Sequence, residues 1–452
     1  MRRVPTDENG RELVPPPVQP QLNQRVIGNK VVPLVTQVRS YELITPLFGG
    51  GVEPGEADPV MVIRGPEIRG QLRFWWRACR GGRFNGDLAA MKEAEDKLWG
   101  AAGTERKPMP SQVEIMVSIE QSGESEHPFE VVAGSTDGRK GQPKPKLKAN
   151  EIVAPAYAAF PLQPSEKEMR AGGIGMQTKT VRTKVHFTLK ITYPEKRREE
   201  VEAALWAWET FGGIGARTRR GFGALKLVSV DGRPVTPPGV GEVEAKIREG
   251  LQKYVVNGTW PAGVPHLCLN PRIKVTGAYS DPKDAWEYLV KCLRNFRQSR
   301  YPGASPKQPG RSRWPEPDEI RRLTGRRCPR HAKPLSTVKK FPRAAFGLPI
   351  VFHFKDEKIG DPYDTTLQGR DYERLASPLI LRPLACADGA VGLAVILEGT
   401  GVMALPDGLV LGKKEDPDIS WPVNAELDPQ EAQQIPPLNG NPDVLKAFLN
   451  TL

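Results

Sequence analysis

Apolar and polar positions alternate in some segments of this chain and follow a helical spacing in others. Residues 31–43 start apolar and pass into alternation, which is typical of a β-strand. From Pro66 to beyond Trp76, and again at 87–99, the spacing predicts helices with one apolar face. The same criteria predict the other elements of the first half: strands at 112–120 and 180–193, a helix at 194–211 and a strand at 222–230.

The predicted order of strand, helix, strand, strand, helix and strand is that of a ferredoxin-like βαββαβ domain, the framework that RRM domains also use. The second half repeats this plan less clearly, with strands predicted at 267–277, 347–354, 379–386 and 391–398 and helices at 281–300 and 442–452. Proline and glycine cluster at 232–241, which indicates a domain boundary. The pattern therefore predicts an α+β protein: a mobile leader at 1–24 and ferredoxin-like domains at 25–235 and 236–452.

Two basic segments interrupt the predicted elements. Residues 138–148 alternate lysine with proline, and residues 303–325 are rich in proline and basic side chains. Proline breaks regular structure, and a run of like charges is usually solvated. We therefore expect exposed loops at both places, and a solvated loop rather than a defined nucleic-acid contact at 138–148.

The charge balance favours a polyanionic partner. The 452 residues contain 65 Lys and Arg against 53 Asp and Glu, a net charge of +12, and the isoelectric point is about 9.4. The sequence has no apolar signal-peptide core and no stretch typical of a transmembrane helix. The five cysteines are odd in number and form no CxxC pair. We expect a reduced, cytoplasmic protein that does not contact a membrane.

One fragment resembles part of a metal site. Cys328 and His331 are separated by two residues, but a single Cys/His pair supplies half of a tetrahedral zinc site at most. On that spacing alone we predict no metal, and no other cofactor.

An arginine stripe lies on the first predicted helix. At about 100° per residue, Arg69, Arg73, Arg77 and Arg80 fall within about 80° of one another, beside an apolar arc that contains both tryptophans. No acidic residue of this helix lies among them. Because the planar guanidinium group donates two parallel hydrogen bonds to phosphate oxygens, the stripe favours polyanion binding over a merely solvated basic face.

A glycine-rich loop follows the helix at 194–211. Residues 212–223 combine several glycines with Arg217, Arg219 and Arg220, and they match neither a Walker loop nor GxGxxG. Glycines allow close backbone approach, and consecutive amides can form an anion nest. The loop follows the negative end of a helix, so the arginines must supply the attraction. An extended backbone with several phosphates suits this loop better than one nucleotide.

These motifs resemble a known family. The segments are Leu43-Ile-Thr-Pro-Leu-Phe-Gly-Gly-Gly51, Ile63-Arg-Gly-Pro-Glu-Ile-Arg-Gly-Gln-Leu-Arg-Phe-Trp-Trp-Arg77, Gly212-Gly-Ile-Gly-Ala-Arg-Thr-Arg-Arg-Gly-Phe-Gly223, Phe341-Pro-Arg-Ala-Ala-Phe-Gly-Leu-Pro-Ile350 and Ser377-Pro-Leu-Ile380. Together they are similar to the first RAMP-superfamily subunit of the Cmr complex, the type III-B CRISPR effector.

The resemblance implies two ferredoxin-like RAMP domains in a non-catalytic subunit near the crRNA 3′ end. It implies crRNA, single-stranded target RNA and other Cmr-complex RAMP subunits as partners, in antiviral defence. Arg69 and Arg73 lie in the frame that resembles the family's RNA-contacting helix. The predicted RNA-binding residues are Arg64, Arg69, Arg73, Arg77, Arg80, Gly213, Gly215, Arg217, Arg219 and Arg220.

An RNA-cleaving RAMP subunit is the alternative. Asp58 lies in a Gly/Pro-rich loop, at a position similar to that of the acid in the target-cleaving backbone subunit. Of the five histidines, only His331 lies in a basic loop, where it would act as a general acid or base. No acidic cluster for two metals accompanies the basic motifs. A nucleotide-binding regulator is a third class, which the missing phosphate motifs disfavour.

Overall fold

The computed structural model describes most of the chain. The described residues are 24–27, 30–51, 61–104, 107–136, 143–305, 310–402, 405, 408–413 and 416–452. The predicted leader, apart from Gln24, lies outside them.

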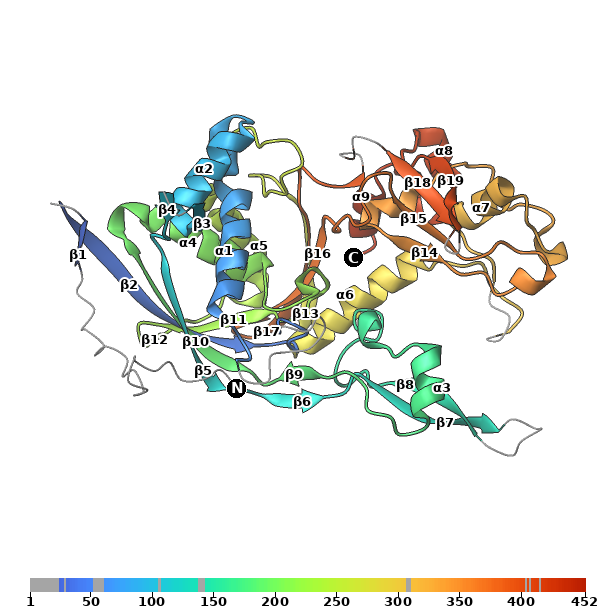
Figure 1. Ribbon diagram of the computed structural model, residues 1–452, viewed down its shortest axis with the longest axis horizontal. Helices are drawn as coiled ribbons and strands as arrows, with labels where there is room; N and C mark the ends of the chain where they lie inside the picture. Colours follow the sequence, from blue (N-terminus) through green and yellow to red (C-terminus); the bar gives the residue numbers. More distant parts are fainter. Residues whose placement is uncertain are drawn as a thin grey trace.

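One antiparallel sheet forms the base of the N-terminal half (Figure 1). Its strands are β1 (Gln24–Ile27), β2 (Lys30–Leu43), β5 (Glu114–Gln121), β10 (His186–Pro194), β11 (Leu225–Val230) and β12 (Arg233–Pro234). They follow the order β12-β11-β2-β10-β5, with β1 paired to β2. The long strand β2 is therefore central. β10 and β11 pair with it, and β5 pairs with β10.

The strand predicted at 180–193 is two strands. Lys184 has a left-handed φ of 55°, which breaks the extended chain between β9 (Val181–Thr183) and β10. β9 pairs with β6 (Glu124–Glu126) in a separate ribbon. Apolar alternation continues across the break, so the pattern alone did not reveal it.

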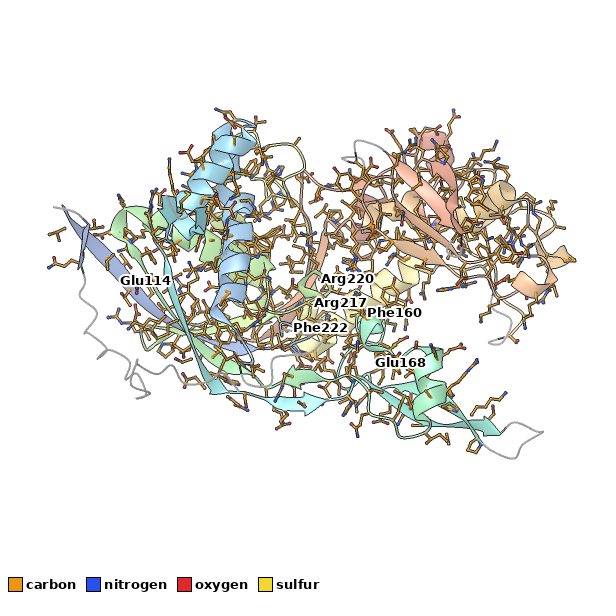
Figure 2. The ribbon with its side chains drawn as sticks, viewed as in Figure 1. Glu114, Phe160, Glu168, Arg217, Arg220 and Phe222 are labelled. Atoms are coloured by element: carbon orange, nitrogen blue, oxygen red, sulfur yellow. The ribbon has the colours of Figure 1, made fainter. Side chains whose placement is uncertain are left out.

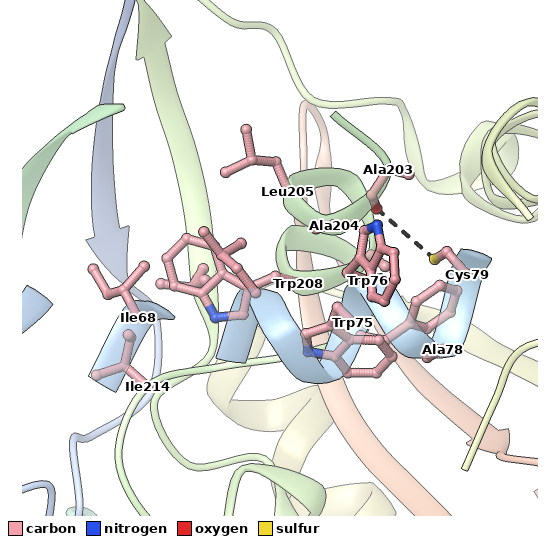
Figure 3. Packing of buried hydrophobic residues seen from close by; sticks show 14 of the residues in the cluster. Ile68, Trp75, Trp76, Ala78, Cys79, Ala203, Ala204, Leu205, Trp208 and Ile214 are labelled. Carbon is pink, nitrogen blue, oxygen red and sulfur yellow. Dashed lines mark hydrogen bonds between the residues drawn. The ribbon is translucent and has the colours of Figure 1, made fainter. Parts of the chain in front are cut away.

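Helices cover one face of this sheet (Figure 1). They are α1 (Gly65–Arg80), α2 (Leu88–Trp99), α4 (Arg198–Phe211) and α5 (Val243–Tyr254). Figure 3 shows α1 packed on α4 through Trp75, Trp76 and Trp208, all almost completely buried. The tryptophans of the arginine-rich helix are thus core residues, and they fix which face of α1 turns outward.

A smaller extension projects beside the sheet (Figure 1). It contains β7 (Phe129–Thr136), β8 (Pro143–Ala149) and α3 (Glu166–Gly172), while β3 (Ala101–Thr104) and β4 (Lys107–Met109) form a ribbon next to α2. The basic segment expected to be a solvated loop therefore contains β8. Exposed Lys146 and Lys148 alternate there with the partly buried Leu147. Successive side chains of a strand point to opposite faces, so the lysines face solvent while the leucine packs against the protein. Residues 137–142 lie outside the described residues.

The C-terminal half has two antiparallel sheets. The first, in the order β13-β17-β16, contains β13 (Arg272–Tyr279), β16 (Leu379–Cys386) and β17 (Gly389–Ile396), and α6 (Pro282–Arg297) packs on it. The second, in the order β14-β15-β18-β19, contains β14 (Ile350–Phe352), β15 (Thr365–Gly369), β18 (Leu409–Lys413) and β19 (Asp416–Val423). The remaining helices are α7 (Glu316–Thr324), α8 (Pro429–Gln433) and α9 (Val444–Leu449).

Helix α7 corrects the exposed loop expected at 303–325. Pro317 lies in its first turn with Glu316 and Asp318, Arg321 and Arg322 lie in its last turn, and the chain leaves it at a left-handed glycine. These are ordinary helix start and stop signals. The overall richness in proline and basic residues obscured them.

The architecture is mixed α and β with antiparallel sheets. The core of the N-terminal half continues past residue 235, since Leu251 of α5 and Leu393 of β17 belong to the same buried cluster as Trp208. The boundary between 235 and 236 stays a prediction. No helix within the described ranges is long and apolar enough to cross a lipid bilayer; α1 and α6, with 16 residues each, are the longest.

Candidate nucleic-acid interface

The start of α1 is attached to the glycine-rich loop. The Glu67 carboxylate accepts a hydrogen bond from the Gly215 amide at 2.6 Å, and Arg64 Nη2 donates to the Gly50 carbonyl at 2.9 Å. Burial raises the pKa of Glu67, although the Gly215 hydrogen bond and nearby Arg64 oppose the shift. The two predicted motifs therefore meet in space, at the N-terminal end of α1.

The arginine stripe on α1 is not free of acids. Arg73 Nε and Arg77 Nη1 lie 2.6 and 2.5 Å from Glu95 Oε1, and Arg73 also pairs with Asp96 at 3.2 Å. The Glu95 side chain is only 3% exposed. Arg80 pairs with acids of α4. The expectation of four arginines without acids among them is therefore wrong for Arg73, Arg77 and Arg80, because α2 and α4 bring carboxylates that the sequence of α1 does not contain.

Arg69 differs from the other three. Its Nη1 donates to the Trp99 carbonyl at 3.3 Å, and no carboxylate of the described residues lies within ion-pair distance. Burial, and then the charge of Arg73, lower the pKa of Arg69. Of the stripe, this guanidinium group carries the least compensated charge.

The glycines of residues 212–223 are needed for packing within the protein. Gly215 has a φ of +81°, and a Cβ there would lie 2.5 Å from the Phe48 carbonyl oxygen. A Cβ at Gly213 would lie 2.8 Å from the Gly223 oxygen. The amides of Ala216 and Gly223 donate to other backbone carbonyls, as that of Gly215 does to Glu67. These amides are occupied, so they do not form the expected anion nest.

The arginines of the loop contact the C-terminal half. Arg219 donates to the Ser377 carbonyl and lies over the Phe74 ring of α1, 5.5 Å from its centroid. Arg220 Nη1 donates to the Leu379 carbonyl at 2.9 Å, at the start of β16. Burial, with the repulsion of neighbouring arginines, lowers the pKa of Arg220 to about 9. Backbone carbonyls, and not carboxylates, are the partners of both groups.

Arg297 joins these residues from the end of α6. Its Nη1 donates to the Tyr157 hydroxyl at 2.9 Å, and its charge lowers the pKa values of Arg217 and Arg220 further, after burial. We call Arg217, Arg219, Arg220 and Arg297 the loop cluster. Within the described part of the chain, no carboxylate lies within ion-pair distance of any member.

Two buried polar atoms of the loop cluster have no hydrogen-bond partner within the described part of the protein. Arg217 Nε and Arg297 Nε are buried and make no hydrogen bond. Figure 2 shows Arg217 and Arg220 at the junction of the two halves, with Phe160 next to them in this view. Phe160 belongs to the short η2 turn (Phe160–Leu162), and Phe160 is 64% exposed. The preceding residues Ala158 and Ala159 pack in one buried cluster with Phe222. The segment with this exposed ring also contains Tyr157, which accepts a hydrogen bond from Arg297 of the loop cluster.

Sequence reasoning missed Arg297, Tyr157 and Phe160. Arg297 occupies the last turn of a helix, where a basic residue is ordinary, so no signal distinguished it. Asp58, the candidate nuclease acid, lies outside the described residues. His331 contacts Cys328, Asp361 and Arg321 in the C-terminal half instead of the loop cluster.

Comparison with known proteins agrees with the motifs. Residues 40–226, which include α1 and the glycine-rich loop, match the RAMP superfamily. Over 190 residues the chain is 28% identical to the protein named CRISPR system Cmr subunit Cmr1-2 of Pyrococcus furiosus, covering 41% of this chain and 91% of that protein. The predicted resemblance to a RAMP subunit of the Cmr complex is confirmed.

The comparisons also include a second curated protein and two solved structures. Cmr1-1 of Pyrococcus furiosus is 26% identical over 167 residues, covering 37% of this chain and 40% of that protein. The crystal structure of Cmr1 from Pyrococcus furiosus superposes with a TM-score of 0.47 at 16% identity, over 80% of this chain and 88% of that one. A chain of the type III-B Cmr-beta complex, bound to cognate target RNA and AMPPnP, gives 0.45 at 14% identity, over 92% and 98%.

Proposed function

We propose that this chain is an RNA-binding subunit of a type III-B CRISPR effector complex. It binds the guide crRNA near its 3′ end, target RNA, or both, mainly through phosphate contacts, and it works beside other Cmr-complex RAMP subunits in antiviral defence. Similarity to two Cmr1 proteins supports the assignment to the complex. The RNA-binding role rests on the electrostatics of the candidate interface.

The loop cluster is the observation that carries this proposal. Four guanidinium groups gather at one junction, where burial and then the charges of Arg297, Arg217 and Arg219 lower the pKa of Arg220. Arg219, Arg220 and Arg297 donate to carbonyl or hydroxyl oxygens in place of carboxylates. A neutral protein partner would not relieve this repulsion, whereas phosphate oxygens accept from guanidinium groups with strong charge-assisted hydrogen bonds. The glycines position the loop by packing, and the arginines supply the attraction.

The RNA path extends from the loop cluster toward α1. Arg219 lies over Phe74 of α1, and Arg69 lies on the same helix with no carboxylate of the described residues within ion-pair distance. Arg64, directly before this helix, donates to the Gly50 carbonyl and has Glu67 as its acidic neighbour. Arg73, Arg77 and Arg80 contribute less to RNA binding than the other predicted arginines, because a phosphate would have to compete with the carboxylates that already pair with them. Phe160 supplies a ring on which one base stacks without sequence preference.

Both halves are proposed to be ferredoxin-like. In the N-terminal half, β2, β5, β10 and β11 lie in the spatial order β11-β2-β10-β5, with α1 and α4 connecting them in the βαββαβ sequence. In the C-terminal half, the order β13-β17-β16 with α6 on it matches three strands and one helix of the same plan. The domain limits 25–235 and 236–452 belong to this proposal.

Co-purification followed by RNA extraction tests the proposal. The chain, expressed with the other subunits of its effector complex and a CRISPR array, should elute with them and with short RNAs that share a repeat-derived tag. Alone, it should bind single-stranded RNA with little sequence preference and leave the strand intact with Mg²⁺ or Mn²⁺. Elution of the chain apart from the complex would overturn the assignment, and cleavage lost in Asp58→Ala would make it a nuclease subunit.

A further inference from the structure

Two turns of the C-terminal half lie against each other beside α7. The first is η6 (Pro329–His331), preceded by Cys328, and the second is η8 (Glu357–Ile359), preceded by Asp356 and followed closely by Asp361. The Cys328 amide donates to Asp361 Oδ1 at 3.1 Å, which joins the turns. Neither turn takes part in the interface described above.

Four side chains of these turns converge on one point. Cys328, His331, Asp356 and Asp361 each offer a ligand atom, and these atoms lie within 4.8 Å of one another. Cys328 Sγ lies 3.1 Å from His331 Nδ1, which lies 2.9 Å from Asp361 Oδ2. With zinc bonds of about 2.0–2.3 Å, tetrahedral ligands lie roughly 3.2–3.8 Å apart, so small side-chain shifts would place a metal between them.

The cluster is not a group of solvated acids. Cys328 is completely buried and Asp361 is 2% exposed. A buried carboxylate is costly unless charges or hydrogen bonds compensate it. Asp361 is held in place by Arg321, which donates to both of its oxygens.

The position of His331 Nδ1 favours a cation over hydrogen bonds alone. Cys328 Sγ, Asp361 Oδ2 and Arg321 Nη2 all lie within 3.1 Å of this one nitrogen. A ring nitrogen carries either one hydrogen or one lone pair, so it cannot donate to a carboxylate and accept from a guanidinium group at once. A metal ion would take the lone pair and bind the sulfur and the carboxylate directly, and Arg321 would then donate to Asp361 and not to the ring nitrogen.

We propose that Cys328, His331, Asp356 and Asp361 bind one zinc ion. A thiolate, an imidazole and two carboxylates form a set that zinc accepts, whereas Mg²⁺ and Ca²⁺ prefer oxygen ligands alone. Zn²⁺ and the Arg321 guanidinium group would offset one thiolate and two carboxylates, while Arg330 pairs with Asp356 and Asp318 pairs with Arg321. The Cys-x-x-His pair was half of a site, and the fold supplies the other half from residues about 30 positions later in the chain.

With four protein ligands the site is structural. Zinc would link η6 to η8. Because Arg321 of α7 donates to Asp361, the site would also hold α7 against these turns. Ligand binding stabilises the folded state by mass action, so zinc should raise the melting temperature of the full chain by several degrees, about 5 °C at saturating metal.

The test uses the tag-free full-length chain, stripped with a chelator, reloaded with zinc and freed of excess metal. Elemental analysis should find about one zinc per chain in the native protein and in the control Cys268→Ser, whose thiol lies elsewhere. Cys328→Ser should retain less than about a fifth of this zinc, and so should Asp356→Asn, which changes a more exposed ligand and keeps the fold.

Cobalt provides a second readout. Bound Co²⁺ should give a thiolate charge-transfer absorption in the native chain that is lost in Cys328→Ser and kept in Cys268→Ser. Absence of stoichiometric zinc in the reloaded native chain, or an unchanged zinc content in both Cys328→Ser and Asp356→Asn, would overturn the proposal and leave these residues as an ion-pair network around Arg321.

Discussion

The arginine stripe of α1 and the loop cluster contain the same side chain in two electrostatic settings. In the stripe, Arg73 and Arg77 share the buried carboxylate of Glu95. In the loop cluster, Arg219 and Arg220 donate to carbonyls of the C-terminal half. A carboxylate neutralises the charge of its partner, whereas a carbonyl satisfies hydrogen bonds and leaves the charge in place. Positive potential therefore depends on partners from distant elements more than on the number of arginines on one face.

Magnitudes support this distinction. Two unit charges 4 Å apart near a protein surface interact by about 4 kcal/mol, so a phosphate that reaches Arg73 must compete with an attraction of that order. A phosphate that reaches Arg217 or Arg297 competes with no described carboxylate and relieves repulsion instead.

The largest expected effect is on stability. Arg220→Ala should lower the free energy of unfolding by about 3 kcal/mol, because it removes a buried donor from carbonyls that join the two halves. Arg73→Ala should lower it by only about 1 kcal/mol, since Arg77 remains to pair with Glu95. Urea unfolding measures both. Equal losses of unfolding free energy would mean that carbonyl and carboxylate partners stabilise the folded chain by the same amount, which would contradict this prediction.

The next largest effect is expected when the carboxylate shared by two stripe arginines is removed, so that their charge is no longer neutralised, as in the loop cluster. Glu95→Gln leaves Arg73 and Arg77 without their shared carboxylate, which should cost about 2 kcal/mol of stability and strengthen RNA binding about threefold. Fluorescence anisotropy with a labelled RNA measures the affinity. The control Glu166→Gln removes an exposed acid of α3 and should change neither quantity. Weaker RNA binding by Glu95→Gln would show that the stripe needs its acids to be positioned.

A smaller effect is expected at the exposed ring. Phe160→Ala should weaken single-stranded RNA binding about fivefold, which corresponds to roughly 1 kcal/mol for one stacked base. Ile152→Ala, which removes another exposed apolar side chain of the same region, should not change the affinity. If both variants lose affinity equally, the effect is one of apolar surface and not of stacking.

The smallest prediction concerns pH. Burial raises the pKa of Glu67 in the folded state above its unfolded value, so ionisation of this group opposes folding. Its contribution is most favourable below the unfolded pKa and is lost as pH rises through the folded pKa. Glu67→Gln should therefore gain stability relative to the native chain between about pH 4 and pH 7. A constant difference across that range in urea unfolding would contradict the shift.

Much of the N-terminal half could be predicted from local patterns. The apolar spacing of α1 and α4 and the alternation of β2 and β5 reflect burial of one face, which a single segment records. Elements with weak patterns were missed, such as β8, whose lysines and prolines concealed a pairing with β7. The break at Lys184 was also hidden, because it depends on one backbone angle.

The candidate site was less predictable, because it depends on contacts between distant segments. The α1 motif and the glycine-rich loop were identified, yet their partners come from elsewhere: Glu95 from α2, Arg297 from α6 and the carbonyls from the start of β16. Cys328 and His331 likewise met their acidic neighbours only in the folded chain. The identity of a charged residue does not indicate which residues from distant segments will pair with it in the folded protein.

The most direct test compares matched double variants in RNA binding across salt concentrations. Arg217→Gln with Arg297→Gln should weaken binding at least tenfold and reduce the slope of log K against log salt by about 1.4, which is two contacts at about 0.7 each. Arg73→Gln with Arg77→Gln should weaken binding less than about threefold and leave the slope nearly unchanged, with thermal melting confirming that both variants fold. A larger loss of affinity and slope in the stripe variant than in the loop variant would contradict the assignment of RNA binding to the loop cluster.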